Sequence, residues 1–127
     1  MDTIANLLTS LLNAQNVGKA RVAVPASKQA QRILEVLKHR ERIADMRLTE
    51  GTPAQLIVTL RYEGKQPVIR GVRRLSSPGA HQHVSKNELP YPTRGEGFYV
   101  ISTSRGLMDE KKARKEGLGG ELMCEIW

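Results

Sequence analysis

Apolar residues change their spacing partway along the chain, and this change most constrains the fold. Between residues 3 and 17 they recur at helical intervals, and a second helical stripe follows Ser27, a suitable N-cap. Between residues 54 and 62 apolar and polar residues instead alternate, as in a half-buried strand. The expected buried helix positions are Ile4, Leu7, Leu8, Leu11 and Leu12, then Ala30, Ile33, Leu34 and Leu37.

The first half of the chain therefore predicts helices that alternate with strands. Short strands are expected at 21–24, 43–49 and 54–62, and Pro25 ends the first of them. The start of the first helix would be capped by Asp2 or Thr3. These elements predict an N-terminal α-β-α-β-β lobe over residues 1–63.

The second half has mainly β patterns. Strands are expected at 68–75, 98–101 and 121–127, with a tight turn at 76–79. Asp109 can cap a helix of about two turns that ends at Gly117. Apolar residues of the last strand, Leu122, Cys124 and Ile126, would share one buried face. We predict an α+β fold of two small lobes, with a mainly β C-terminal lobe over residues 64–127.

A net charge of +7 arises from 20 Lys and Arg against 13 Asp and Glu, and both halves share it. Folded basic chains of this size often bind nucleic acid, because neutralised phosphates release counterions; a solvated basic surface is the alternative. The single cysteine forms no internal disulfide, and no apolar run reaches the roughly 18 residues of a membrane span. We expect a cytoplasmic protein without a membrane partner.

Three hydroxyl residues, Ser102, Thr103 and Ser104, follow the buried strand Phe98–Ile101. A nucleophilic serine needs a base and an oxyanion hole, but neither serine lies in a G-x-S-x-G elbow. The sequence also shows no recognisable orienting acid for any of the histidines, which are His39, His81 and His83. A serine-nucleophile hydrolase is kept as an alternative, and we predict no catalytic residue.

The sequence also disfavours a phosphate-binding site and a metal site. The glycines between 117 and 120 follow a helix, and Gly106 precedes one whose first turn is acidic and would repel an anion. The histidines at 81 and 83 supply two ligands, fewer than a zinc site needs. We therefore predict no nucleotide, cofactor, metal or small-molecule substrate.

Two interpretations of the hydroxyl segment remain. Short hydroxyls beside Gly106 can approach the sugar-phosphate chain of RNA closely, or they can end the strand as an ST-turn. The chemistry of the residues supports the RNA contact and the ST-turn about equally, and the net positive charge favours the RNA contact. Basic side chains that would attract RNA over a distance are Arg70, Arg73, Arg74, Lys86, Arg94 and Arg105.

The stretch ISTSRGLMDEKKARKEGLGGE resembles the signature of the eighth protein of the small ribosomal subunit, a universal family, in its bacterial-type form. In that family a strand ends in Ser-Thr-Ser, then a basic residue and Gly, then a short helix, and Gly-Gly-Glu opens the last strand. The segments 2–9, 24–28, 74–79 and 88–90 also match in order and spacing. The resemblance thus covers the whole chain, although residues 80–84 depart from the usual basic and aromatic pattern.

The resemblance implies a non-enzymatic structural constituent of the small ribosomal subunit. Such a protein binds a helical region of small-subunit ribosomal RNA and supports assembly of the subunit in the cytoplasmic ribosome. Its implied partners are that RNA and neighbouring small-subunit proteins, including the fifth. A messenger-RNA-binding translational repressor is the alternative.

The resemblance also implies RNA-binding residues by position. Glu121 would hold the hydroxyl loop or meet a base, and Gly119 and Gly120 would aim it toward residues 102–104. Pro25, Ser27 and Lys28 are implied as secondary contacts in the first lobe. The implied residues of the second lobe are Arg74, Ser76, Ser77, Pro78, Gly79, Ser102, Thr103, Ser104, Arg105, Gly106 and Glu121.

Overall fold

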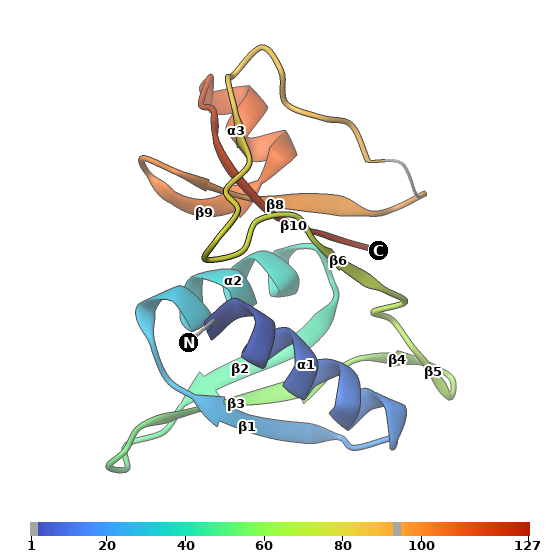
Figure 1. Cartoon of the computed structure of the whole chain (residues 1–127). Coiled ribbons are helices and arrows are strands. Elements are labelled where there is room, and N and C mark those ends of the chain that lie inside the picture. The colour runs from blue at the N-terminus through green and yellow to red at the C-terminus, as the bar shows by residue number, and fades with distance from the viewer. Residues whose placement is uncertain (1–2, 93–94) are drawn as a thin grey trace. The chain divides into compact units, whose positions relative to one another are not determined.

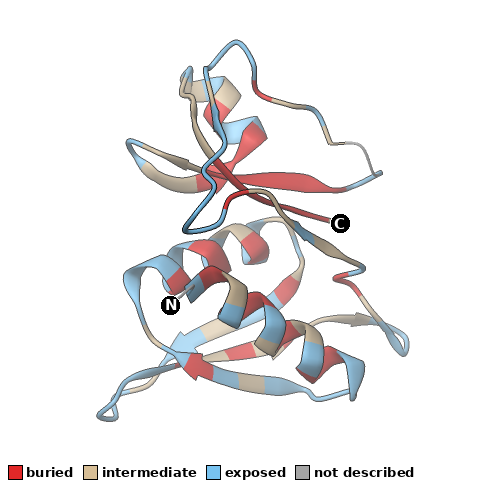
Figure 2. Cartoon of the chain, viewed as in Figure 1, coloured by how far each residue is buried: buried red, intermediate tan, exposed pale blue. Residues whose placement is uncertain are grey.

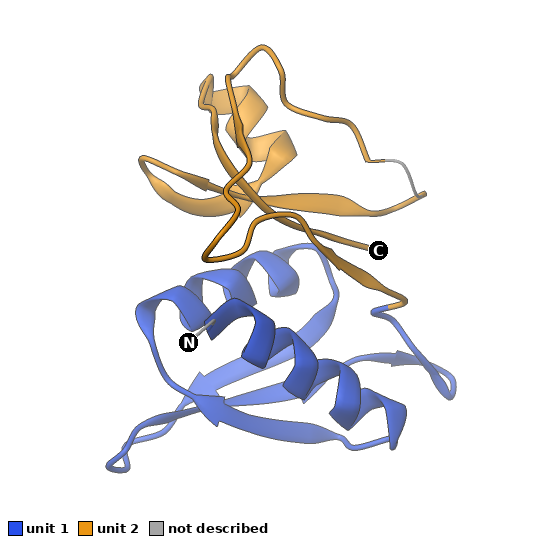
Figure 3. Ribbon diagram, viewed as in Figure 1, with its two compact units in different colours: residues 1–69 blue, residues 70–127 orange. Residues whose placement is uncertain are grey.

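The computed structural model (Figure 1) describes residues 3–92 and 95–127. Two compact units are present, Met1–Ile69 (unit 1) and Arg70–Trp127 (unit 2) (Figure 3). The mixture of helices and strands confirms the predicted α+β class, and no helix in the described ranges is long and apolar enough to cross a membrane. The division into lobes 1–63 and 64–127 stays a prediction. Asp2 and Arg94, named above, lie outside the described residues.

Unit 1 packs two helices against one face of an antiparallel sheet (Figure 1). Its elements are α1 (Thr3–Asn16), β1 (Arg21–Pro25), α2 (Lys28–His39), β2 (Ile43–Leu48), β3 (Gln55–Leu60), β4 (Tyr62–Glu63) and β5 (Gln66–Pro67). The sheet has the order β1-β3-β2, so β3 is paired on both sides. The last two strands form a separate short hairpin.

The core of unit 1 lies between the helices and the sheet. The two predicted helix stripes are confirmed: every member is buried except Leu12, which is half-buried, and Figure 2 shows buried and exposed residues alternating along both helices. From β3, Leu56, Val58 and Leu60 are buried in the predicted alternation. Ser27 caps α2 as predicted, since its hydroxyl accepts a hydrogen bond from the Ala30 amide at 3.0 Å.

Unit 2 places the last strand of the chain in the middle of its sheet. Its elements are β6 (Val72–Arg74), β7 (His83–Val84), β8 (Phe98–Thr103), β9 (Gly106–Asp109), α3 (Glu110–Glu116) and β10 (Gly120–Ile126). The order is β6-β10-β8-β9, and β7 also pairs with β10. Asp109 caps α3 by accepting from the Lys112 amide at 2.7 Å, and Gly117 ends it with a left-handed φ of 68°, both as predicted.

The strand expected over residues 68–75 is wrong in its extent, because only Val72–Arg74 join the ladder. Just before it, the amides of Arg70 and Gly71 both donate to the Trp127 carbonyl oxygen, at 2.7 and 3.1 Å. The Gly71 carbonyl oxygen accepts in return from the Trp127 amide at 3.1 Å, so the pairing reaches Trp127, whereas the Val68 amide donates to the Arg61 carbonyl oxygen of unit 1 at 3.3 Å. The strands β7 and β9 were not expected; residues 106–109 form a strand paired with β8 where the sequence suggested an approach to the helix.

The expectation that Leu122, Cys124 and Ile126 share one face is also wrong. A β-bulge between Leu122 and Cys124 shifts the register, so Leu122 lies opposite Ile101 and Cys124 lies opposite Val100. Adjacent residues of a strand point to opposite faces, so the bulge sends these two side chains to different faces. Cys124 is nevertheless fully buried, as predicted for a core residue.

Candidate nucleic-acid interface

The β8–β9 hairpin ends in an exposed tip formed by Ser104 and Arg105. At its base the Thr103 hydroxyl donates to the Gly106 carbonyl oxygen at 2.8 Å and accepts from the Arg105 amide at 3.1 Å. Gly106 has a φ of 104°, which side chains with a Cβ rarely adopt. One of the three hydroxyls thus holds the turn, as the ST-turn interpretation expected, while Ser104 stays exposed.

Arg105 also contacts the helix that follows the hairpin. Its guanidinium lies 3.3 Å from the Glu116 carboxylate, and Lys112 approaches the same carboxylate at 4.0 Å. The side chain of Arg105 is 69% exposed, so this ion pair contributes little to stability. Arg105 therefore keeps a solvent-facing charge at the tip.

The start of β10 lies directly against the end of β8. Glu121 is the register partner of Ser102, which confirms that the glycine-rich segment brings it beside the hydroxyl loop. A Cβ added at Gly120 would lie 2.1 Å from the Ser102 carbonyl oxygen, and one at Gly119 would lie 2.5 Å from the Val84 carbonyl oxygen. Two adjacent glycines are thus needed for this close backbone approach.

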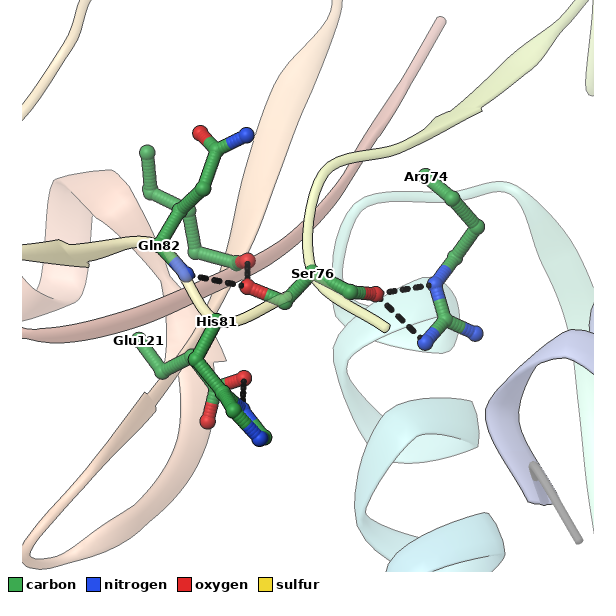
Figure 4. Close-up of polar contacts among 6 residues, drawn as sticks. Arg74, Ser76, His81, Gln82 and Glu121 are labelled. Atoms are coloured by element: carbon green, nitrogen blue, oxygen red, sulfur yellow. Dashed lines mark hydrogen bonds and ion pairs between the residues drawn. The ribbon is translucent and has the colours of Figure 1, made fainter. Parts of the chain in front are cut away.

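Ser76 joins the segment before β7 to the centre of the sheet (Figure 4). It is buried; its hydroxyl donates to the Leu122 carbonyl oxygen and accepts from the Gln82 amide at 3.0 Å. Its carbonyl oxygen accepts two bonds from the Arg74 guanidinium, at 2.9 and 2.6 Å. The structure therefore gives Ser76 and Arg74 a role in holding this segment against β10.

The next residues form a tight turn that is exposed. Ser77 and Ala80 exchange two backbone hydrogen bonds, of 2.9 and 3.1 Å, and Pro78 and Gly79 lie at the tip between them. Because Ser76 is fastened to β10, this turn is anchored at the residue just before it. The turn predicted at 76–79 thus lies one residue further along, at 77–80.

His81 and Glu121 form an ion pair that was not predicted (Figure 4). The distance between His81 Nδ1 and Glu121 Oε2 is 2.7 Å. The hydrogen bond and the charge of Glu121 raise the pKa of His81, and the same hydrogen bond lowers the pKa of Glu121. The expectation that no histidine has an orienting acid is therefore wrong for His81. The sequence did not reveal the pair because 40 residues separate its two members.

The hydroxyl segment lies beside this pair through the β8–β10 ladder. In residues 3–92 and 95–127, no hydrogen bond joins Ser102 or Ser104 to an imidazole. Over the same residues, no group of three or more His, Cys, Asp or Glu side chains is arranged to hold a metal. The Glu121 carboxylate and the His81 imidazole lie next to the β8–β10 pairing, beside the β8–β9 hairpin.

The remaining candidates belong to unit 1. Pro25 ends β1, and Ser27 and Lys28 lie at the start of α2, all three exposed. The hydroxyl of Ser27 is used as the helix cap, while the Lys28 side chain extends into solvent from the first turn. These residues present a positive charge at the N-terminus of a 12-residue helix.

These features define a small, basic α+β protein whose second unit displays polar and charged residues at the ends of adjoining strands. The chain belongs to the ribosomal protein S8 family, whose model matches residues 2–127. It is 44% identical over 131 residues to the small ribosomal subunit protein uS8 of Kosmotoga olearia, covering 99% of this chain and 98% of that protein. The protein of that name from Synechococcus elongatus is 41% identical over 129 residues, covering 99% and 97%. The resemblance drawn from the sequence is confirmed.

Proposed function

We propose that this protein is a structural constituent of the small ribosomal subunit that binds a helical region of small-subunit ribosomal RNA and supports assembly of the subunit. The observation that carries the proposal is the family match over nearly the whole chain. Relatives at about 40% identity are named as small ribosomal subunit proteins. The charge of +7 is consistent with an RNA partner.

The proposed RNA-binding corner consists of the hairpin residues Ser102–Gly106, Glu121, and the turn Ser77–Gly79. In this proposal Ser104 and Arg105 contact RNA directly, because they are exposed at the tip. Thr103 keeps the tip in shape through its two hydrogen bonds. Short side chains on an ordered turn suit close approach to the sugar-phosphate chain and to 2′-hydroxyls.

Other residues of unit 2 act on this corner indirectly in our proposal. Arg74 and Ser76 fasten the Ser77–Gly79 turn to the sheet and meet RNA less directly, since the Ser76 side chain is buried. Glu121 orients groups beside Ser102 through its place in the ladder. Ser27 and Lys28 supply a second contact from unit 1, where the helix N-terminus favours a phosphate.

The proposal places the protein in the cytoplasmic ribosome, with ribosomal RNA and neighbouring small-subunit proteins, including the fifth, as partners. No chemical reaction is assigned to it. The family match supports this assignment over the serine hydrolase kept open above. Ser104 in this proposal binds RNA through its hydroxyl.

The test is a comparison of two dissociation constants at one salt concentration. The purified protein is titrated into a helical fragment of small-subunit ribosomal RNA and into a generic RNA duplex of equal length. We expect tighter binding to the ribosomal fragment by at least about tenfold, roughly 1.4 kcal/mol. Equal affinities at moderate salt would refute specific recognition, because a basic surface alone binds both duplexes alike.

A further inference from the structure

A titratable ion pair lies at the edge of the RNA-binding corner. Glu121 is the ladder partner of Ser102, and its carboxylate lies 2.7 Å from His81 Nδ1. The side chain of His81 is 54% exposed and that of Glu121 is 20% exposed, so solvent reaches the pair. A lone carboxylate at this place would repel the phosphates of a bound RNA, whereas an imidazolium beside it cancels that charge.

We propose that His81 is a positioning residue for RNA binding: in its protonated form it orients and neutralises Glu121, so that RNA binding is coupled to uptake of a proton. This inference rests on the proposed function and adds to it the residue that makes affinity depend on pH. The juxtaposition of His81, Glu121 and Ser102 carries it.

The charged and titratable groups around His81 come from three segments. Glu121 faces it from β10, and the His83 ring on β7 lies 6.4 Å from its own ring between centroids. The turn before it contributes the Pro78 carbonyl, which is uncharged. Arg74 lies on the opposite side of Ser76, where it donates two bonds to the Ser76 carbonyl oxygen (Figure 4). Within the part of the chain that the structure describes, the Glu121 carboxylate is thus the acidic group of this cluster.

The direction of the pH effect follows from the two pKa shifts. Glu121 raises the pKa of His81 above its ordinary 6.5, while the pKa of Glu121 is held below 4.5. Near neutral pH the carboxylate therefore stays ionised, and the imidazolium loses its proton as the pH rises through the raised pKa of His81. Affinity for RNA is then highest at acidic pH and falls as the pH rises through the raised pKa of His81.

The first test measures the dissociation constant for the ribosomal RNA fragment at about pH 6 and about pH 8.5 with ionic strength held constant. The wild type is expected to bind on the order of two- to fivefold more weakly at the higher pH, as for the loss of one exposed charge. His81→Gln should bind equally at both values, and His81→Arg should bind tightly at both. His39→Gln, which removes an exposed histidine of unit 1, should retain the wild-type dependence.

The second readout is the pKa of His81 itself, followed by NMR of its ring protons with and without the RNA fragment. Linkage requires RNA to raise this pKa if binding takes up a proton. An unchanged pKa, or a His81→Gln variant with the wild-type pH dependence, would overturn the inference while leaving the proposed function intact. Failure to distinguish the ribosomal fragment from a generic duplex at either pH would instead overturn both.

Discussion

Gly120→Ala is the substitution that most directly tests how the proposed RNA-binding corner is built. The added Cβ would lie 2.1 Å from the Ser102 carbonyl oxygen, 2.9 Å from the Ser102 carbonyl carbon and 3.2 Å from the Thr103 Cα. All three are backbone atoms, so no flexible side chain can move aside. A carbon and a carbonyl oxygen need about 3.3 Å, so the two strands must separate by roughly 1.2 Å.

The expected loss of stability follows from that separation. Overpacking of this kind costs about 1–3 kcal/mol, and each ladder hydrogen bond that lengthens beyond bonding distance adds about 1 kcal/mol. We expect Gly120→Ala to lower the free energy of unfolding by about 3 kcal/mol. For a chain of this size that corresponds to a fall in Tm of roughly 12 °C.

The assay is thermal unfolding followed by circular dichroism, with Gly79→Ala as the matched control. Gly79 is exposed in the same unit, and a Cβ there would meet no atom within 4 Å. The control should stay within about 0.5 kcal/mol of the wild type. A Gly120→Ala variant that unfolds at the wild-type temperature would refute the close approach of β10 to β8 at this position.

Three further outcomes are expected. Ser76→Ala should cost about 1–3 kcal/mol in urea unfolding, because the buried Ser76 hydroxyl bonds both the Leu122 carbonyl oxygen and the Gln82 amide, and no change would contradict the anchoring role of Ser76. Cys124, whose pKa burial raises to about 12, should react with a thiol reagent at about pH 8 only as fast as the protein unfolds, and rapid native labelling would contradict its burial. Ser104→Ala should weaken binding to the ribosomal RNA fragment more than Lys111→Ala, and the reverse ranking would indicate a purely electrostatic binder.

Local signals were sufficient to predict most of unit 1. The stripes of α1 and α2 depend on the 3.6-residue period, and the Ser27 cap depends on one hydroxyl and the amide three residues on. The caps of α3, Asp109 and Gly117, follow from the same kind of local chemistry. Such features involve neighbours in sequence, so the sequence displays them directly.

Apart from β9, which forms a local hairpin with β8, the unpredicted features of unit 2 depend on distant partners. The extent of β6 is set by its pairing with β10, which lies at the other end of unit 2 in the sequence. The bulge at Leu122 and Cys124 is a matter of register with β8, and a period-two pattern contains no information on register shifts. The ion pair of His81 with Glu121 joins residues 40 apart, which no local motif indicates.

The central claim is that RNA binds at the corner formed by the β8–β9 hairpin and the start of β10. Its most direct test is to map backbone amide chemical shifts of the labelled protein as the ribosomal RNA fragment is added. The largest changes are predicted at Ser104, Arg105, Gly106 and Glu121. Changes concentrated instead on exposed residues of the unit 1 sheet, such as Arg21 and Arg47, with the hairpin unaffected, would contradict the claim.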